Sequence, residues 1–363
     1  MITLLDGDHP DLLEHLRLTR AGGDVPLVSD ARWPAAQRES VTALAATAEL
    51  PPDAAWATLT SGSSGRPRVV IRSADSWATS FGTVATLLDA GPDDVVLLPA
   101  PPSASLSLFS LAHALSGGPR PALGRSTQAS ATCLHGTPEG LRAVLDAGVP
   151  STLRTALIGG SHLDEALRRR AQDAGIRVIA YYGAAELSFV AVDRGDGLEA
   201  FPGVELDIRA GELWVRSPFV ASGYVGGGGP LRREEGWASV GDRAELTDGR
   251  LRLLGRADAA ILSASATIVP EEVEEVLRSV SGVRDAVVFG VPRARVGALV
   301  AAFLELEGEI PIALRDRVQS GLAPVHRPRR WFAGELPRTA SGKPARAEAA
   351  RRALAGEVPR VVL

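Results

Sequence analysis

The sequence predicts an α/β protein. A large layered N-terminal domain with mostly parallel sheets carries a small β subdomain and precedes a small α+β C-terminal domain. Apolar runs of strand length first alternate with helical segments. The pattern then changes to the two-residue period of a hairpin. A Gly-Arg-Ala-Asp segment at residues 255–258 finally precedes a stretch with its own helix and strands. We therefore expect domains at residues 1–255 and 256–363.

The parallel sheet is predicted from a series of short apolar runs, which are typical of strands covered on both faces. These runs lie at residues 56–59, 95–98, 132–134, 155–158 and 178–181. An amphipathic helix over residues 163–171 lies between the last two and ends before Gly175. The first 50 residues are rich in Ala, Leu and Asp, and they predict only short helices and loops.

The β subdomain is predicted from residues 204–208 and 212–216, which alternate with period two around Ala210-Gly211. The four glycines at residues 226–229 are typical of a flexible loop rather than of a phosphate cradle. In the C-terminal domain, Pro270 and the acidic residues that follow it predict the first turn of a helix. The elements expected there are a helix over 269–277 and strands over 284–291 and 299–306.

Composition excludes several classes of function. The 363 residues carry a formal net charge of -4 and show no basic stripe, so no nucleic-acid partner is expected. No run of 18 apolar residues and no secretory signal pattern occurs, so we expect no membrane partner and a cytoplasmic location. The single cysteine, Cys133, excludes a disulfide framework within the chain, and we expect it to be a core thiol rather than a nucleophile.

Lysine is almost absent from the chain. Among the 39 Lys and Arg residues only Lys343 is a lysine. A lone lysine in such a background invites a chemical explanation, although chance survival would also account for it. Composition alone leaves both explanations open.

A Ser/Gly-rich segment follows the first predicted strand. Its glycines let backbone amides approach an anion and its hydroxyls add donors, so it suits a polyphosphate. It is not a Walker A loop, because no Gly-Lys-Ser/Thr ending follows. On its own, such a segment is more often an ordinary turn. It consists of Thr60, Ser61, Gly62, Ser63, Ser64, Gly65, Arg66, Pro67 and Arg68.

Taken with four further segments in order, this one resembles the signatures of the acyl-adenylate-forming superfamily, which holds acyl- and aryl-CoA ligases, nonribosomal adenylation domains and luciferases. The resemblance runs from Thr60 to Arg346, about four-fifths of the chain. In size the chain is similar to compact o-succinylbenzoate–CoA ligases. The other segments are Tyr-Tyr-Gly-Ala-Ala-Glu at 181–186, Gly-Trp-Ala-Ser-Val-Gly-Asp at 236–242, residues 255–258 with 268–274, and Leu-Pro-Arg-Thr-Ala-Ser-Gly-Lys at 336–343.

The resemblance assigns a nucleotide-binding set. In the family, the Ser/Gly segment binds phosphates, a glycine pair approaches adenine, and a tyrosine stacks near it. An aspartate accepts the ribose hydroxyls, which is natural for a carboxylate that faces a diol. The matching residues are Thr60, Ser61, Gly62, Ser63, Ser64, Gly65, Arg68, Gly159, Gly160, Tyr182, Gly183, Asp242 and Arg256.

The resemblance also implies three catalytic residues and a hinge. Glu186 is expected to help hold Mg²⁺, for which a carboxylate is a suitable ligand. Lys343 is expected to reach the substrate carboxylate and the α-phosphate, where a mobile point cation is needed. The third is Arg256, and Asp258 resembles the hinge about which the mobile C-terminal domain rotates. Because the only lysine falls at this position, we expect the first half-reaction to be intact.

The chain departs from the family pattern at several positions. Ala185 and Val240 stand where threonine is usual, and residues 263–267 lack the glycine pair that lines the acceptor tunnel in the family. The His or aromatic pair that usually borders the acyl pocket is absent after Leu98. The change at 263–267 bears more on the acceptor than on adenylation. The change at Ala185 bears on the rate, and the missing pair points to an unusual acid.

The resemblance implies an acid–thiol ligase (AMP-forming) that uses ATP, Mg²⁺ and coenzyme A. It would activate a carboxylic acid as its acyl-adenylate and transfer the acyl group to coenzyme A. One alternative keeps adenylation but transfers the acyl group to the pantetheine of an acyl carrier protein, or to an amine. Another is a degenerate nucleotide-binding regulatory protein, which the changes at Ala185, Val240 and Ser265 motivate.

Overall fold

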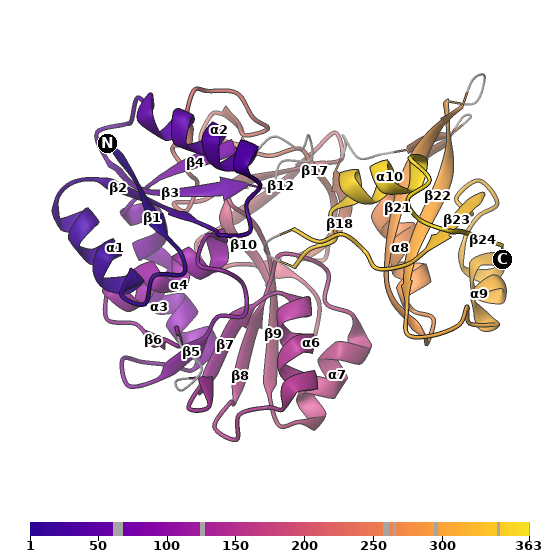
Figure 1. Cartoon of the computed structure of the whole chain (residues 1–363), viewed down its shortest axis with the longest axis horizontal. Helices are drawn as coiled ribbons and strands as arrows, with labels where there is room; N and C mark the ends of the chain where they lie inside the picture. The colour runs from indigo at the N-terminus through magenta and orange to yellow at the C-terminus, as the bar shows by residue number, and fades with distance from the viewer. Residues whose placement is uncertain are drawn as a thin grey trace.

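The computed structural model describes residues 1–60, 68–123, 128–256, 261–263, 266–293, 297–339 and 342–362. In this part of the chain, strands β1 to β18 form three sheets, which we call the N-terminal body. Strands β19 to β24 form a fourth sheet, which we call the C-terminal unit with its helices. Figure 1 shows the C-terminal unit, in orange and yellow, on one side of the body. The predicted α/β class is confirmed.

The first sheet combines parallel and antiparallel strands. Its first three strands run parallel, and the fourth runs antiparallel to both of its neighbours. Helix α2 (Ala35–Ala46) covers one face, and α1 (Leu12–Ala21) packs on the other. The strand order is β1 (Ile2–Asp6), β2 (Val25–Ser29), β3 (Ala54–Thr60), β4 (Arg68–Ser73) and β14 (Gly223–Tyr224).

The prediction that the first 50 residues hold only short helices and loops is wrong, because β1 and β2 lie there. Pro26 argues against a strand in sequence, since proline cannot donate to a ladder. The tertiary structure overrides that signal. Val25 and Leu27 are buried against α2, and Pro26 lies in register with Thr3 of β1.

The second sheet is the parallel sheet that the apolar runs predict. All of its pairs are parallel except those of β10 with β9 and β11. The strand order is β11 (Glu199–Ala200), β10 (Ser188–Asp193), β9 (Arg177–Ala184), β8 (Thr155–Ile158), β7 (Cys133–Gly136), β5 (Val95–Leu97) and β6 (Arg120–Pro121).

Helices cover both faces of this sheet (Figure 1). Helices α3 (Asp75–Leu88) and α4 (Ser105–Leu115) lie between the first two sheets, and α6 (Pro138–Ala147) and α7 (Glu165–Asp173) cover the other face. Each outer helix has a side-chain cap. Thr137 Oγ1 accepts from the Gly140 amide at 3.2 Å, and Asp164 Oδ1 accepts from the Leu167 amide at 2.7 Å.

The third sheet is antiparallel and contains the predicted hairpin. Ala210 and Gly211, which join its two strands, both have positive φ, as a tight two-residue turn between twisted strands requires. The main strand order is β15 (Arg232–Glu234), β16 (Trp237–Ser239), β13 (Glu212–Arg216), β17 (Asp242–Thr247) and β18 (Arg250–Arg256), with β12 (Glu205–Arg209) also paired to β13.

The C-terminal unit is a sheet with helices on both faces. Helix α8 (Pro270–Arg278) begins with the predicted proline and packs beside α9 (Ala313–Gly321) on one core, while α10 (Arg346–Leu354) packs on the other. The strand order is β20 (Ala266–Ile268), β19 (Ile261–Ser263), β22 (Gly297–Leu306), β23 (Arg330–Ala333) and β24 (Arg360–Val361), and β21 (Val283–Arg293) pairs with β22.

The single cysteine is a core thiol. Cys133 is fully buried in the body, and burial raises its pKa to about 12. The thiolate is therefore absent at neutral pH, as the core interpretation predicts. Within the described ranges, no helix combines the length and the apolarity that a membrane crossing requires.

Candidate active site

Lys343 lies where a loop of the C-terminal unit meets the N-terminal body. A Cβ atom placed on Gly160 would lie 3.0 Å from Lys343 Cε and 3.7 Å from its Nζ. Burial lowers the pKa of this ammonium, and the charges of Asp242 and Glu186 act in the opposite direction. A cation of one unit therefore lies within electrostatic reach of two carboxylates of the other.

Glu186 is held in place from two sides. Its side chain is only 6% exposed, and the Tyr224 hydroxyl donates to Glu186 Oε1 at 2.8 Å. Behind it, the fully buried Arg72 donates from Nε and Nη2 to the Ala185 carbonyl at 3.0 and 2.6 Å. Burial lowers the pKa of Arg72 to about 9, and the charge of Glu186 opposes that shift. Glu186 is thus a fixed carboxylate with a buried cation close by.

Asp242 is oriented by Tyr182, the second tyrosine of the motif at 181–186. The Tyr182 hydroxyl on β9 donates to Asp242 Oδ2 at the start of β17. Asp242 also lies in register with Arg256 on β18. The second and third sheets therefore meet at this pair, and two residues 60 positions apart in sequence become neighbours.

Three predicted glycines lie where no side chain fits. A Cβ atom on Gly159 would lie 2.2 Å from Tyr181 Cζ, and one on Gly183 would lie 2.1 Å from the Ser188 carbonyl oxygen. Gly160 has a φ of +90°, which disfavours other residues. Close packing within the protein explains Gly159 and Gly183 without a ligand, so the approach of the pair Gly159 and Gly160 to adenine stays a prediction.

A layer of neutral polar and aromatic side chains lies behind Gly159. His135 Nδ1 lies 2.7 Å from Ser110 Oγ, and His135 Nε2 lies 3.0 Å from the Tyr181 hydroxyl. Burial, helped by the charge of His113, lowers the pKa of His135 to about 3. His135 and Tyr181 are therefore uncharged near neutral pH. We call His135, Tyr181, Phe109 and Phe189, whose rings pack together, the aromatic wall.

The Ser/Gly segment is described only at its two ends. Thr60 ends β3, Arg68 begins β4, and the two residues lie in register. Arg256 ends β18. Ser61, Gly62, Ser63, Ser64 and Gly65 lie outside the described residues, as does Asp258. The phosphate-binding and hinge roles therefore stay predictions, whereas Lys343, Glu186, Asp242, Tyr182 and Gly160 are brought together.

Two residues of the site were missed by sequence reasoning. Arg72 and Tyr224 are brought to Glu186 by the pairing of β4 with β14, far apart in the chain. Arg72 interrupts the apolar run of β4, and Tyr224 is one of only three tyrosines. A charge inside an otherwise apolar strand signals a buried functional or structural cation, and that signal was available.

Comparison with known protein families matches both parts of the chain. The family described as AMP-binding enzyme matches residues 5–225. The family described as AMP-binding enzyme C-terminal domain matches residues 272–343. The second match ends at Lys343.

Curated relatives include two 2-succinylbenzoate–CoA ligases. The chain is 32% identical to that of Salmonella typhimurium over 349 residues, which is 91% of this chain and 74% of the relative. It is 31% identical to that of Escherichia coli over 293 residues, which is 76% of this chain and 63% of the relative. This chain therefore spans only part of the length of these relatives.

Solved structures share the fold. One is a variant of E. coli MenE with bound OSB-AMS, with a TM-score of 0.81 at 24% identity, covering 92% of this chain and 83% of that one. Another is o-succinylbenzoate CoA synthetase (MenE) from Bacillus subtilis in complex with the acyl-adenylate intermediate OSB-AMP, with a TM-score of 0.80 at 21% identity, covering 96% and 87%. The chain therefore belongs to the AMP-binding enzyme family, and the two curated relatives above are acid–CoA ligases.

Proposed function

We propose that the chain activates a carboxylic acid with ATP as an acyl-adenylate and transfers the acyl group to coenzyme A. One observation carries the proposal. Lys343, the only lysine, lies beside Gly160 and within electrostatic reach of Glu186 and Asp242. A lysine with only a structural role would be unfavourable in such a position, because the burial of its ammonium outweighs the attraction of the two carboxylates.

The first half-reaction places negative charge where Lys343 lies. A carboxylate oxygen of the acid attacks the α-phosphorus of ATP, the bond to the bridging oxygen breaks, and pyrophosphate leaves. Lys343 holds the attacking carboxylate and the α-phosphate together and counters the charge that develops between them. Asp242, oriented by Tyr182, accepts hydrogen bonds from the ribose hydroxyls.

The second half-reaction needs no new protein charge. The sulfur of coenzyme A attacks the acyl carbon, the thiol proton is lost to solvent, and AMP leaves as the C–O bond breaks. Lys343 has to withdraw first, because the acceptor must approach the same carbon. We propose that residues 256–363 turn as a domain about Asp258 for this step.

Mg²⁺ fits the site only as an ion held largely by phosphates. Among the described residues no cluster of three His, Cys, Asp or Glu side chains could hold a metal by itself. Glu186 is fixed by one oxygen to Tyr224, so its second oxygen can be a single protein ligand, in the manner usual for magnesium. Mg²⁺ bound there would neutralise the charge of the leaving pyrophosphate.

The names of the relatives point to the acid, and the single cysteine points to the compartment. 2-Succinylbenzoate is the first acid to test, because both relatives described above are named for it. We propose a cytoplasmic location, since the free thiol of Cys133 suits a reducing compartment. The alternative acceptors, a carrier-protein pantetheine or an amine, are outcomes of the same test.

The test is a mass-spectrometric screen with ATP, Mg²⁺ and a panel of acids, each with and without coenzyme A. The panel contains 2-succinylbenzoate, benzoate and aliphatic acids, and Lys343→Ala is the matched control. We expect an acyl-AMP peak that becomes acyl-CoA when coenzyme A is added. An acyl-AMP peak that persists in the presence of coenzyme A would indicate a different acceptor. The absence of an adenylate with every acid would favour the regulatory alternative.

A further inference from the structure

The loop that carries Lys343 rests on the N-terminus of α6. A Cβ atom placed on Gly342 would lie 3.4 Å from Glu139 Cβ and 3.5 Å from Thr137 Oγ1. Thr137 is the N-cap of α6 and Glu139 lies in its first turn, so both are fixed by the helix start. The contact therefore joins a rigid part of the body to the residue directly before Lys343.

Arg338 shapes this loop from within the C-terminal unit. Its Nη1 donates to the Gly342 carbonyl and to Asp285 Oδ2, both at 3.1 Å, and its Nη2 donates to Glu305 Oε2 at 2.9 Å. The loop is closed further by the Thr339 amide, which donates to the Lys343 carbonyl at 2.7 Å. One guanidinium thus ties the backbone beside Lys343 to strands β21 and β22.

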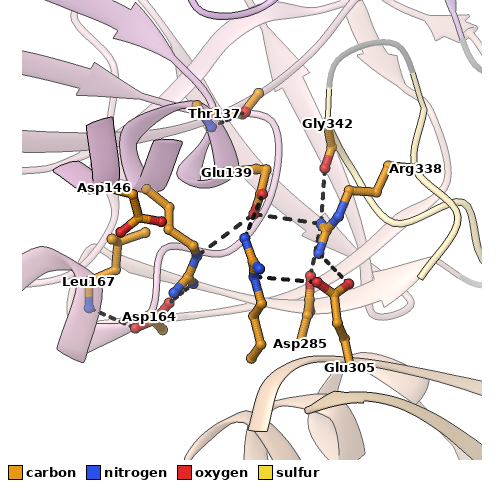
Figure 2. Close-up of polar contacts among 12 residues, drawn as sticks. Thr137, Glu139, Asp146, Asp164, Leu167, Asp285, Glu305, Arg338 and Gly342 are labelled. Atoms are coloured by element: carbon orange, nitrogen blue, oxygen red, sulfur yellow. Dashed lines mark hydrogen bonds and ion pairs between the residues drawn. The ribbon is translucent and has the colours of Figure 1, made fainter. Parts of the chain in front are cut away.

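Glu139 is the partner of this cluster on the other side of the junction. Glu139 Oε1 lies 3.5 Å from Arg284 Nη2, and Glu139 Oε2 lies 3.9 Å from Arg338 Nη1. Arg284 Nε in turn lies 3.3 Å from Glu305 Oε1. Figure 2 shows Glu139 facing Arg338, with Asp285, Glu305 and Gly342 around the same guanidinium.

The charges on each side remain paired if the two units separate. Arg338 and Arg284 would keep Glu305, and Glu139 would keep Arg142 on its own helix, whose Nε lies 3.7 Å away. Separation therefore leaves each of these charges with a partner, which removes the main penalty for breaking these partly buried ion pairs. Such a contact can form and release repeatedly.

We propose that Glu139 is the docking point for the Lys343 loop and that Arg338 is a positioning residue for Lys343. Together they favour the arrangement in which Lys343 lies beside Gly160. This inference rests on the proposed function, because it assigns the arrangement to the adenylation step. Glu139 and Arg338 act through Lys343 and touch no reacting atom.

The first experiment separates the two half-reactions in Glu139→Gln. This substitution keeps the shape of the side chain and removes the charge that faces Arg284 and Arg338. We expect pyrophosphate exchange to slow about five- to thirty-fold, the effect of losing one or two kcal/mol of docking free energy. Transfer to coenzyme A from supplied acyl-AMP should change less than about two-fold, and Glu139→Asp should restore part of the exchange rate.

The matched control is Glu348→Gln. Glu348 pairs with Arg351 and Arg352 on its own helix, α10, within the C-terminal unit. The Glu348→Gln substitution removes a charge of the same sign as Glu139→Gln does, and it should leave both half-reactions unchanged. An equal loss of both half-reactions in Glu139→Gln, or an unchanged exchange rate, would overturn the inference.

A second readout needs no substrate. Cysteines at the exposed positions Asp173 and Gln319 would carry a dye pair, and the buried Cys133 would stay unlabelled. Single-molecule energy transfer should show one main population in the parent chain and a second population after Glu139→Gln. Identical distributions would refute the docking role. If no acid gives an adenylate, the proposed function fails, while this readout still tests the contact.

Discussion

The aromatic wall and the junction at Glu139 are both polar, yet they are built in opposite ways. In the wall, His135 is buried and Tyr181 is partly buried, both are uncharged, and a hydrogen bond joins them. At the junction, Glu139 and Arg284 are charged and remain 28% and 39% exposed. Neutral buried groups cannot separate without losing their partners, whereas half-exposed charges can exchange protein partners for water.

The difference shows which part of the molecule is rigid. The wall fixes Gly159 and the end of β9, where the motif at 181–186 begins. The junction decides only whether the Lys343 side chain lies beside Gly160 in the site. A substitution in the wall should therefore change stability, whereas a substitution at the junction should change one half-reaction and leave the free energy of unfolding nearly constant.

The largest effect is expected from Lys343→Ala. Loss of the one cation at the reacting centre should lower pyrophosphate exchange about 10²- to 10³-fold, the usual effect of deleting one electrostatic group. Transfer from supplied acyl-AMP should stay within about two-fold. The free energy of unfolding should not fall, because burial of the ammonium is unfavourable. An equal loss in both half-reactions would contradict the assignment of Lys343 to the adenylation step alone.

Gly159→Ala tests the rigidity of the wall. The new methyl group would lie 2.2 Å from Tyr181 Cζ, so the ring has to move and its bond to His135 has to break or bend. We expect a loss of about 2 kcal/mol in the free energy of unfolding, measured by urea denaturation. Adding Tyr181→Leu should recover part of the loss.

The control for Gly159→Ala is Gly82→Ala in α3. A Cβ atom there meets no other atom within 4 Å, and a helical glycine is costly. That substitution should stabilise the protein by about 0.5 kcal/mol. A Gly159→Ala protein as stable as the parent would mean that the wall can rearrange.

Sequence reasoning was strongest where a residue type has few chemical explanations. The family resemblance, rather than composition, assigned Lys343, Glu186 and Asp242 to one site, and in the structure the charges of Glu186 and Asp242 act on Lys343. The signal failed where tertiary pairing decides. Pro26 made the buried strand β2 look unlike a strand in sequence. Arg72 and Tyr224 come together beside Glu186 only because β14 pairs with β4. The contact of Glu139 depends on how the two units meet, which no local pattern encodes.

The pH dependence of stability should report the buried histidine of the wall. His135 has a pKa of about 3 in the folded chain and an ordinary value of 6.5, so the unfolded chain binds more protons between these values. Its contribution is therefore complete above pH 6.5 and is lost as the pH falls toward 3. At pH 5 the loss should be about 2 kcal/mol.

His135→Gln is the variant that isolates this term. The amide keeps a polar partner for Ser110 and Tyr181 but does not titrate in this range. The decline in unfolding free energy between pH 7 and pH 5 should be about 2 kcal/mol smaller than in the parent chain. An unchanged decline would assign the acid sensitivity to other groups, of which the buried His113 is the first to consider.

The smallest effect is expected from salt at the junction. The Debye length falls from about 10 Å at 0.1 M to about 3 Å at 1 M, so half-exposed pairs such as Glu139 with Arg284 weaken while the neutral wall does not. Pyrophosphate exchange should fall about two-fold over this range through the junction alone. Because salt also weakens ATP binding, the informative quantity is the ratio of the parent chain to Glu139→Gln. That ratio should fall about two-fold as salt rises, since screening removes from the parent part of what the substitution has already removed from the variant. A ratio independent of salt would mean that shape rather than charge holds the Lys343 loop, and the contact of Gly342 with the start of α6 would then be the element to alter next.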